Sequence, residues 1–395
     1  MTQAAALVLA AALLAAACGA GTGPVTASPA RGPLAGGRLS AIAFTGPRHG
    51  YGLFLRDPGA RCQEQVARTA DGGARFTALT AVVTWPCDRA SPAAFLAADQ
   101  SGDVFLYGPR LLVSHDSGAT WSAPRGPGSG RSVVTVAAAG PRSVWLVTTR
   151  CGRPAGELAR CTPGVFRSSD GGRSWRSVQP AGAGFRAVIA GFSGQSWLVP
   201  AGRRGAYLLA RPAVNPRGRA DRVPLWFTRN DGTSWSRRWA RCGFDALYAT
   251  AAVAPDGALF VACAGEPGAG NQEKSVARSA DGGLTWSRHR LCPRRPMTCP
   301  PLSDGYLSAL AAASGRDVYL GGDRSAVLAS HDGGARWGDV RPLLGDGAGG
   351  TFAITFFGPR QGLVLGDDPA AGERPAIWHT SDGGLRWHPT HPAVS

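Results

Sequence analysis

The sequence contains very little lysine and glutamate. Lys274 is the only lysine among 395 residues, so the net charge of +16 rests on 41 arginines, and there are five glutamates. The arginines are spread along the chain, and they form neither a basic helix nor a ladder with aromatic residues, as a nucleic-acid-binding domain would require. The composition therefore argues against a nucleic-acid ligand. It is compatible with an acidic surface or partner outside the membrane, and equally with the codon bias of a GC-rich genome.

Motifs of common enzymes are also missing. The sequence has no H-E-x-x-H zinc motif, no G-x-S-x-G nucleophile elbow and no C-x-x-C couple. The pattern G-x-G-x-x-G occurs at residues 345–350, but a strand pattern follows where a dinucleotide site needs the start of a helix. We therefore expect no metal, no cofactor and no catalytic residue.

Helical periodicity is a third absence. No long stretch repeats its apolar residues every 3.6 positions between helix caps, whereas the chain has 56 glycines and 30 prolines. Short apolar runs instead alternate with turn residues. The chain is predicted to be all-β and rich in loops.

An octamer of the pattern S-x-D-x-G-x-T-W recurs along the chain. Ser279–Trp286 and Ser114–Trp121 match it in full, and five further copies match it in part. Because the copies follow one another at steps of 45 to 60 residues, they indicate a repeat architecture. The Asp or Asn residues of the seven copies are Asp71, Asp116, Asp170, Asn230, Asp281, Asp332 and Asp382.

Each octamer is expected to be a hairpin turn. Its Gly-Gly pair permits positive φ, its Asp carboxylate can accept backbone N–H bonds, and its Trp can cover the edge of a packed sheet. A metal-binding loop would need more oxygen ligands at close spacing than D-G-G supplies. The seven Asp and Asn residues are therefore predicted to be structural.

The octamers resemble the Asp-box, also called the bacterial neuraminidase repeat. This resemblance covers residues 38–395 and implies a seven-bladed β-propeller, in which each box joins strands three and four of a blade. Among the families that share the box, the chain is similar to the photosystem II assembly factors, which implies a scaffold or assembly role. Sialidases also carry the box, but the chain lacks their R-I-P motif, and they have six blades.

A second repeat, G-P-R, is expected in the turn after the first strand of a blade. It occurs at Gly46–Arg48 and Gly358–Arg360. The strand pattern begins and ends at blade boundaries, so no strand exchange between the first and last blades is obvious. The end of the N-terminal segment that precedes residue 38 could still supply an exchanged strand. Blades 2 to 6 are expected to start near Ala93, Val133, Phe185, Leu247 and Leu307.

Residues 1–18 are predicted to be a signal peptide, because the apolar run Ala4–Ala17 is too short for a typical membrane span. Leu14–Gly19 resembles a bacterial lipobox, which implies lipidation of Cys18. Ala15 stands where the lipobox usually has Leu, and simple cleavage after the alanine run is the alternative. Residues 19–37 are predicted to form a flexible tether. The protein is expected at the outer face of the bacterial cytoplasmic membrane, or secreted.

Eight further cysteines fall into neighbouring couples along the chain. An even number after Cys18 fits disulfides in an exported protein, although eight cysteines allow 105 connectivities. The disulfide candidates are Cys62 and Cys87, Cys151 and Cys161, Cys242 and Cys263, and Cys292 and Cys299.

A propeller has two faces on which these segments are distributed. The turn after strand one and the octamer turn lie on one face, here called the box face; the loop after strand two and the linker to the next blade lie on the other, here called the loop face. Variable loops on a rigid scaffold commonly bind ligands, and arginine suits carboxylates. The residues predicted on a loop-face binding surface are Arg150, Arg153, Arg203, Arg204, Arg217, Arg219, Arg222, Arg294, Arg295, Asp367 and Asp368.

The predicted function is a non-enzymatic binding or assembly scaffold of the cell envelope, with a protein or glycan partner. The alternative is a secreted sialidase-like or other glycoside hydrolase, which would need two carboxylates at a defined separation. The carboxylates available for such a pair on the loop face are Glu157, Glu266, Asp323, Asp367, Asp368 and Glu373.

Overall fold

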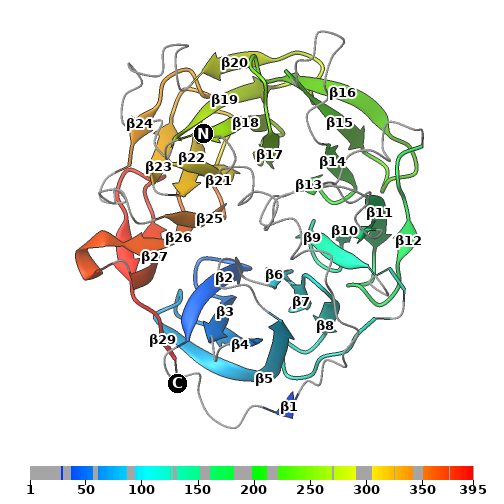
Figure 1. The fold of residues 1–395 in the computed structure, drawn as a ribbon, viewed down its shortest axis with the longest axis vertical. Helices are drawn as coiled ribbons and strands as arrows, with labels where there is room; N and C mark the ends of the chain where they lie inside the picture. The colour runs from blue at the N-terminus through cyan, green and yellow to red at the C-terminus, as the bar shows by residue number, and fades with distance from the viewer. Residues whose placement is uncertain are drawn as a thin grey trace, which may run out of the picture.

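The computed structural model describes residues 28–29, 37–56, 61–86, 94–124, 126–127, 131–151, 161–181, 198–210, 221–268, 271–290, 305–323, 325–340, 350–372 and 374–394. The described strands form seven sheets arranged as blades around a central axis (Figure 1). One short 3₁₀ helix, η4 (Pro369–Ala371), is the only helix among the described residues. The chain is an all-β, seven-bladed propeller, as predicted.

The strands of each blade follow one another in sequence, with the first strand innermost (Figure 1). Blades 1 to 4 consist of β2 (Arg38–Phe44), β3 (Gly50–Arg56), β4 (Arg61–Thr69) and β5 (Arg75–Pro86); β6 (Phe95–Ala98), β7 (Val104–Tyr107) and β8 (Leu111–Ser114); β9 (Ser132–Ala138), β10 (Val144–Cys151), β11 (Cys161–Ser168) and β12 (Arg176–Ser177); and β13 (Leu198–Ala201), β14 (Gly205–Leu209), β15 (Arg222–Thr228) and β16 (Ser236–Arg241).

Blades 5 to 7 repeat this arrangement. They consist of β17 (Tyr248–Val253), β18 (Leu259–Gly268), β19 (Asn271–Ser279) and β20 (Ser287–Arg290); β21 (Tyr306–Ala312), β22 (Val318–Asp323), β23 (Ser325–Ser330) and β24 (Gly338–Asp339); and β25 (Thr351–Phe356), β26 (Gly362–Asp368), β27 (Arg374–Thr380) and β28 (His388–Thr390). In every blade the octamer connects the third strand to the outermost segment, as the sequence predicts.

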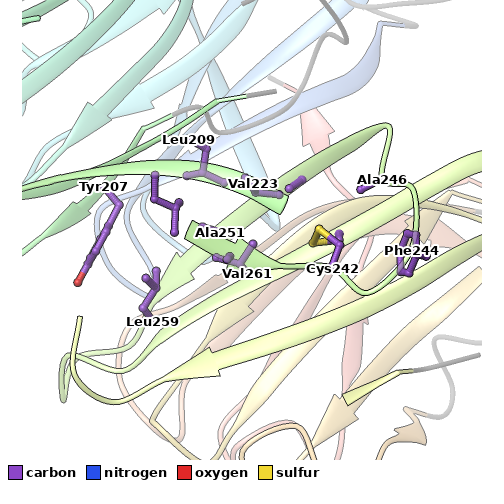
Figure 2. Packing of buried hydrophobic residues seen from close by; sticks show 13 residues of the cluster. Tyr207, Leu209, Val223, Cys242, Phe244, Ala246, Ala251, Leu259 and Val261 are labelled. Atoms are coloured by element: carbon purple, nitrogen blue, oxygen red, sulfur yellow. A yellow bond between two sulfur atoms is a disulfide. The ribbon is translucent and has the colours of Figure 1, made fainter. Parts of the chain in front are cut away.

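The hydrophobic core lies between the blades. Among the described residues there are seven buried apolar clusters, and each is shared by two neighbouring blades, including the last and the first. Figure 2 shows the cluster between blades 4 and 5, where Leu209 and Val223 lie against Ala251 and Val261. Because second strands are covered on both sides, they are apolar along nearly their whole length, as in the fully buried β14.

The octamer turns are closed by their own side chains. In the octamer Ser279–Trp286, the Ser279 hydroxyl donates to Asp281 Oδ1 at 2.7 Å and accepts from the N–H of Gly283 at 2.7 Å. Asp281 Oδ1 also accepts from the N–H of Thr285 at 2.9 Å. Corresponding bonds occur in the other six octamers, and in blade 4 the amide oxygen of Asn230 replaces the carboxylate.

The turn after strand one is bonded to the octamer of the same blade. In blade 7 the N–H of Gly383 donates to the carbonyl oxygen of Arg360 at 2.9 Å, and in blade 1 the N–H of Gly72 donates to that of Arg48 at 2.9 Å. Both arginines belong to the G-P-R repeat. Blades 3, 4 and 6 have the same bond, so the two kinds of turn share the box face as expected.

The ring closes with a contribution from the C-terminal end. β29 (Ala393–Val394) pairs in parallel with β5, the outermost strand of blade 1, and the N–H of Ala393 donates to the carbonyl oxygen of Ala74 at 3.0 Å. β1 (Ser28–Pro29) pairs with the same strand at Ala81 and Val82. The sequence offered no clear sign of the C-terminal pairing, because two residues are too few to show a strand pattern.

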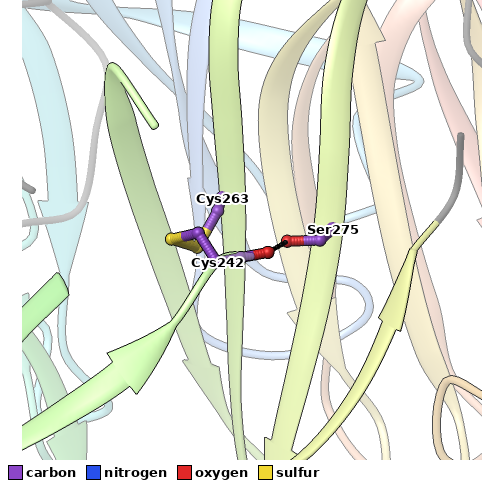
Figure 3. The surroundings of a disulfide bond; sticks show 3 residues. All are labelled: Cys242, Cys263 and Ser275. Atoms are coloured by element: carbon purple, nitrogen blue, oxygen red, sulfur yellow. Dashed lines mark hydrogen bonds between the residues drawn. A yellow bond between two sulfur atoms is a disulfide. The ribbon is translucent and has the colours of Figure 1, made fainter. Parts of the chain in front are cut away.

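Among the residues that the structure describes, a disulfide links two neighbouring blades. Cys242, directly after β16, is bonded to Cys263 in β18, and both residues are fully buried (Figure 3). Ser275 donates to the carbonyl oxygen of Cys242 at 2.9 Å, which holds the linker between blades 4 and 5 against β19. Cys151 lies opposite Cys161 in the β10–β11 register, and Cys62 lies opposite Trp85. Cys87, Cys292 and Cys299 lie outside the described residues.

The octamer carboxylates should make stability depend on acid pH. The hydroxyl and N–H of Thr120 lower the pKa of Asp116 to about 2; although burial raises it, hydrogen bonds from Ser174 lower the pKa of Asp170 to about 2. The pKa of Asp in an unfolded chain is about 3.9. The stabilisation is therefore present above about pH 4 and is lost as the pH falls to about 2. We expect the melting temperature to fall over that range.

The variant Asp116→Asn tests this assignment, since Asn already occupies the equivalent position 230. Its melting temperature, followed by circular dichroism, should be lower than that of the parent at pH 7 and should change less steeply between pH 4 and pH 2. Parallel curves for the two proteins would contradict the assignment.

Candidate functional site

The loop face is described only in part. Arg150, near the end of β10, and Arg222, at the start of β15, are exposed at the loop-face ends of their strands. Glu266, at the loop-face end of β18, is also exposed. The other predicted residues Arg153, Arg217, Arg219, Arg294 and Arg295, with the carboxylates of Glu157 and Glu373, lie outside the described residues.

Two arginines of blade 3 lie close together on this face, because Ser132, which follows Arg131, pairs with Thr149, which precedes Arg150. Arg131 is half-buried, and its Nη1 donates to the carbonyl oxygen of Thr162 at 3.4 Å. Burial lowers the pKa of Arg131, and the positive charge of Arg150 lowers it further. Two neighbouring guanidinium groups that repel each other form a favourable place for a carboxylate, which can accept bonds from both.

Asp367 and Asp368 are engaged in local contacts at the end of β26. Asp367 Oδ2 accepts from the N–H of Gly350 at 3.1 Å, and Asp368 Oδ1 accepts from the N–H of Ala370 at 3.0 Å, capping η4. Asp368 is almost fully buried, and its Oδ2 lies 2.8 Å from Nε2 of His391. These carboxylates therefore organise the loop-face end of blade 7.

The structure corrects the prediction for Arg203 and Arg204. The predicted start of blade 4 near Phe185 lies outside the described residues, and the described first strand is β13. Arg203 and Arg204 therefore occupy the turn between strands one and two, which is on the box face. In the sequence this turn looks like part of the loop after strand two, because the pattern of β13 is only four residues long.

These two arginines belong to a charged cluster between blades 3 and 4. Arg167, which is 6% exposed, lies 3.0 Å from Oδ1 of Asp231, and Nε of Arg204 lies 2.8 Å from Oδ2 of the same residue. Arg167 also donates to Ser143 Oγ at 2.6 Å and to the carbonyl oxygen of Arg203 at 2.9 Å. Burial lowers the pKa of Arg167, and the negative charge of Asp231 opposes this shift.

Asp231 occupies a position that five other octamers give to glycine. Its φ is +56°, in the left-handed region, as is that of Ser117 in blade 2. An L-residue in this conformation costs on the order of 1 kcal/mol relative to glycine. The carboxylate that compensates the buried Arg167 accounts for the presence of Asp at this position.

The central channel contains a cavity of about 430 Å³. It is lined by the innermost strands of blades 2 to 7 and by Tyr107 of β7. Val134, Leu198, Ile354 and Phe356 contribute aliphatic and aromatic surface to it. Burial raises the pKa of Tyr107 to about 12, so its phenol is neutral at physiological pH.

The described residues provide no metal centre. Within the ranges given above, no group of three or more His, Cys, Asp or Glu side chains could hold a metal ion. In that same part of the chain, no helix is long and apolar enough to cross a membrane.

Several residues of these sites have little or no signal in the sequence. Arg131 precedes its strand without any motif, and the burial of Arg167 depends on a neighbouring blade. The one available signal for Asp231 was the departure of octamer 228–235 from the repeat, where Asp replaces the first glycine. The channel lining could be recognised only once the first strands were assigned.

Removal of the Asp231 carboxylate should destabilise the fold. Asp231→Asn leaves Arg167 without its charged partner, so we expect the free energy of unfolding in urea to fall by about 2 kcal/mol. Asp231→Gly should also be destabilised, although glycine relieves the left-handed backbone. Arg204→Ala is the control: its side chain is 71% exposed, and it should cost less than about 1 kcal/mol. A glycine variant as stable as the parent would rule out this role for the carboxylate.

The sequence and the fold were compared with those of known proteins. No protein-family model matches the chain. The photosystem II assembly protein Ycf48 of Synechococcus sp. (strain JA-3-3Ab) is 26% identical over 223 residues, which make up 54% of this chain and 54% of that protein. The chain thus spans about half the length of the curated relatives it matches.

Two solved structures of YCF48 are similar over most of their length. The structure described as YCF48 bound to D1 peptide has a TM-score of 0.53 and 19% identity, covering 88% of this chain and 93% of that one. YCF48 from Cyanidioschyzon merolae has a TM-score of 0.54 and 15% identity, covering 88% and 95%. At this identity the structural likeness establishes a shared fold. The chain is therefore a seven-bladed propeller with sequence similarity to the Ycf48 photosystem II assembly proteins.

Proposed function

We propose that this protein is a non-enzymatic propeller that binds a segment of a protein partner on its loop face. The observation that carries the proposal is the similarity to Ycf48, one structure of which is described as bound to a D1 peptide. By analogy, this chain holds an extended segment of another protein and acts as an assembly or binding scaffold.

The charge of the loop face favours an acidic segment. Arg150 and Arg222 are exposed there, and Arg131 lies close enough to Arg150 for the two charges to repel each other. Carboxylates of a partner would relieve this repulsion and accept bidentate hydrogen bonds. The overall charge of +16 would also speed the approach of an acidic partner.

We further infer that the protein works outside the cytoplasm. The Cys242–Cys263 disulfide is typical of an oxidising compartment, and the predicted signal peptide at residues 1–18 agrees with it. In this proposal Cys18 carries a lipid anchor, residues 19–37 are the tether, and the octamers are Asp-boxes. Nucleic acid is not a partner.

A glycoside hydrolase has less support. Hydrolysis needs a proton donor and a second carboxylate facing a bound sugar. Asp367 and Asp368 instead accept bonds from backbone N–H groups, and Asp368 also contacts His391.

Loop-face arginines should determine the affinity for acidic peptides. Random 12-residue peptides displayed on phage, selected on the purified full chain, should be enriched in Asp and Glu. For a selected peptide labelled with fluorescein, the double variant Arg150→Ser/Arg222→Ser should raise the Kd about fivefold in fluorescence anisotropy, as expected for two exposed charges.

The double variant Arg336→Ser/Arg386→Ser is the matched control, because it removes the same charge from exposed octamer positions on the box face. It should change the Kd less than twofold. Equal losses in both double variants would mean that only the net charge matters, and the loop-face proposal would fail.

The proposed anchor has its own test. Cys18→Ala prevents lipidation at the only cysteine of the leader, so the protein should move from the membrane fraction to the soluble fraction after cell disruption. Immunoblotting of both fractions measures this, with the parent as the control. A variant that still sediments with membranes would exclude Cys18 as the anchor.

A further inference from the structure

The innermost strands of four blades contain a bulge near their loop-face ends. The register between the first and second strands shifts by one residue in blades 1, 3, 6 and 7. A bulged residue is left out of the pairing, and its side chain can be directed away from the sheet. The four bulged residues are Ser40, Val134, Ser308 and Phe352.

The bulged residues of blades 1, 3 and 6 have contacts within the propeller. Ser40 Oγ donates to the carbonyl oxygen of Leu53 at 3.0 Å, and Ser308 Oγ donates to that of Thr351 at 2.5 Å. Val134 lines the central cavity. A serine or a small aliphatic residue is therefore sufficient for the bulge itself.

Blade 7 has an exposed phenylalanine at this position. Phe352 is 42% exposed, and the other large hydrophobic residues exposed to this degree in the described part of the chain are Leu284 and Leu385. Those two leucines belong to octamer turns on the box face. Phe352 is thus the one residue of this kind described on the loop face, where the packing of the fold does not explain it.

The backbone before Phe352 is held firmly. The N–H of Gly350 donates to Asp367 Oδ2 at 3.1 Å, and the N–H of Asp367 donates to the carbonyl oxygen of Gly350 at 3.1 Å. Thr351 is buried, and its carbonyl oxygen accepts from Ser308. An aromatic side chain on a fixed backbone loses little entropy on binding a ligand, so it is well suited as a contact residue.

Apolar residues of the same strand and a cation of the neighbouring strand accompany Phe352. Farther along β25, Ile354 and Phe356 line the cavity of the channel. The neighbouring innermost strand β2 contacts β25, and its first residue, Arg38, is exposed at the same face. This combination matches a peptide that carries an apolar side chain next to a carboxylate.

We propose that Phe352 is a specificity-determining contact of the partner site: it binds an aliphatic or aromatic side chain of an acidic peptide segment at the loop-face mouth of the channel. The inference rests on the proposed function and adds to it an apolar requirement that the arginines alone would not impose. A few aromatic and arginine residues that become buried in an interface commonly account for much of its binding energy.

The phage selection described above provides the probe. Peptides selected on the full chain should contain Leu, Ile, Phe or Trp beside Asp or Glu. In fluorescence anisotropy with one selected peptide, Phe352→Ser should raise the Kd about tenfold, and Phe352→Leu, which keeps an apolar side chain, should raise it less than threefold. Leu385→Ser is the matched control on the box face and should leave the Kd unchanged. Circular dichroism melting confirms that each variant is folded.

The outcomes separate this inference from the proposed function. If no peptide is selected, or if the selected peptides ignore the loop-face arginines, the proposed function fails. If acidic peptides depend on Arg150 and Arg222 but bind the Phe352→Ser variant normally, the proposed function stands and the role of Phe352 is excluded. If Phe352→Ser instead abolishes a dimer seen by light scattering and leaves peptide binding intact, a second copy covers the residue and the inference is likewise overturned.

Discussion

Packing between neighbouring blades is the interaction on which the rest of this structure depends. Each buried cluster takes its residues from two blades, so no blade has a complete core of its own. A fully buried aliphatic or aromatic side chain contributes roughly 1.5–3 kcal/mol, and each cluster contains several. Blade 7 and blade 1 likewise bury a shared apolar cluster, so closure of the ring is stabilised by the same packing as the other blade contacts. The pairing of β29 with β5 adds hydrogen bonds at this closure.

The two faces of the ring have different constraints. On the box face, octamer side chains bond to their own turn, and the octamer backbone bonds to the turn after strand one, so these turns are held by contacts within the blade. Blade 4 departs from the pattern. Asp231 has a left-handed backbone conformation, and its carboxylate compensates the charge of the buried Arg167 of blade 3. On the loop face the connections vary in length, and exposed Arg38, Arg150 and Phe352 are not needed for packing.

Much of the architecture could be predicted from the repeats. Seven octamers at similar spacing led to seven blades, and the box turn connects strands three and four as expected. Arg203 and Arg204 were assigned to the wrong face, because a first strand of four residues has too weak a pattern to be separated from its loops. Asp367 and Asp368 have local bonding roles that depend on Gly350 and His391, which are distant from them in sequence.

By itself the sequence determined the all-β class, the number of blades and the chemistry of their turns, because these depend on short-range patterns repeated along the chain. Tertiary structure alone decided which surface residues come together. The contact between Arg167 and Asp231 needs two blades side by side, and the exposure of Phe352 needs a one-residue bulge in β25, the innermost strand of blade 7. A one-residue bulge cannot be recognised in the hydrophobic pattern of a six-residue strand. The bulge at Phe352 is therefore visible only in the tertiary structure.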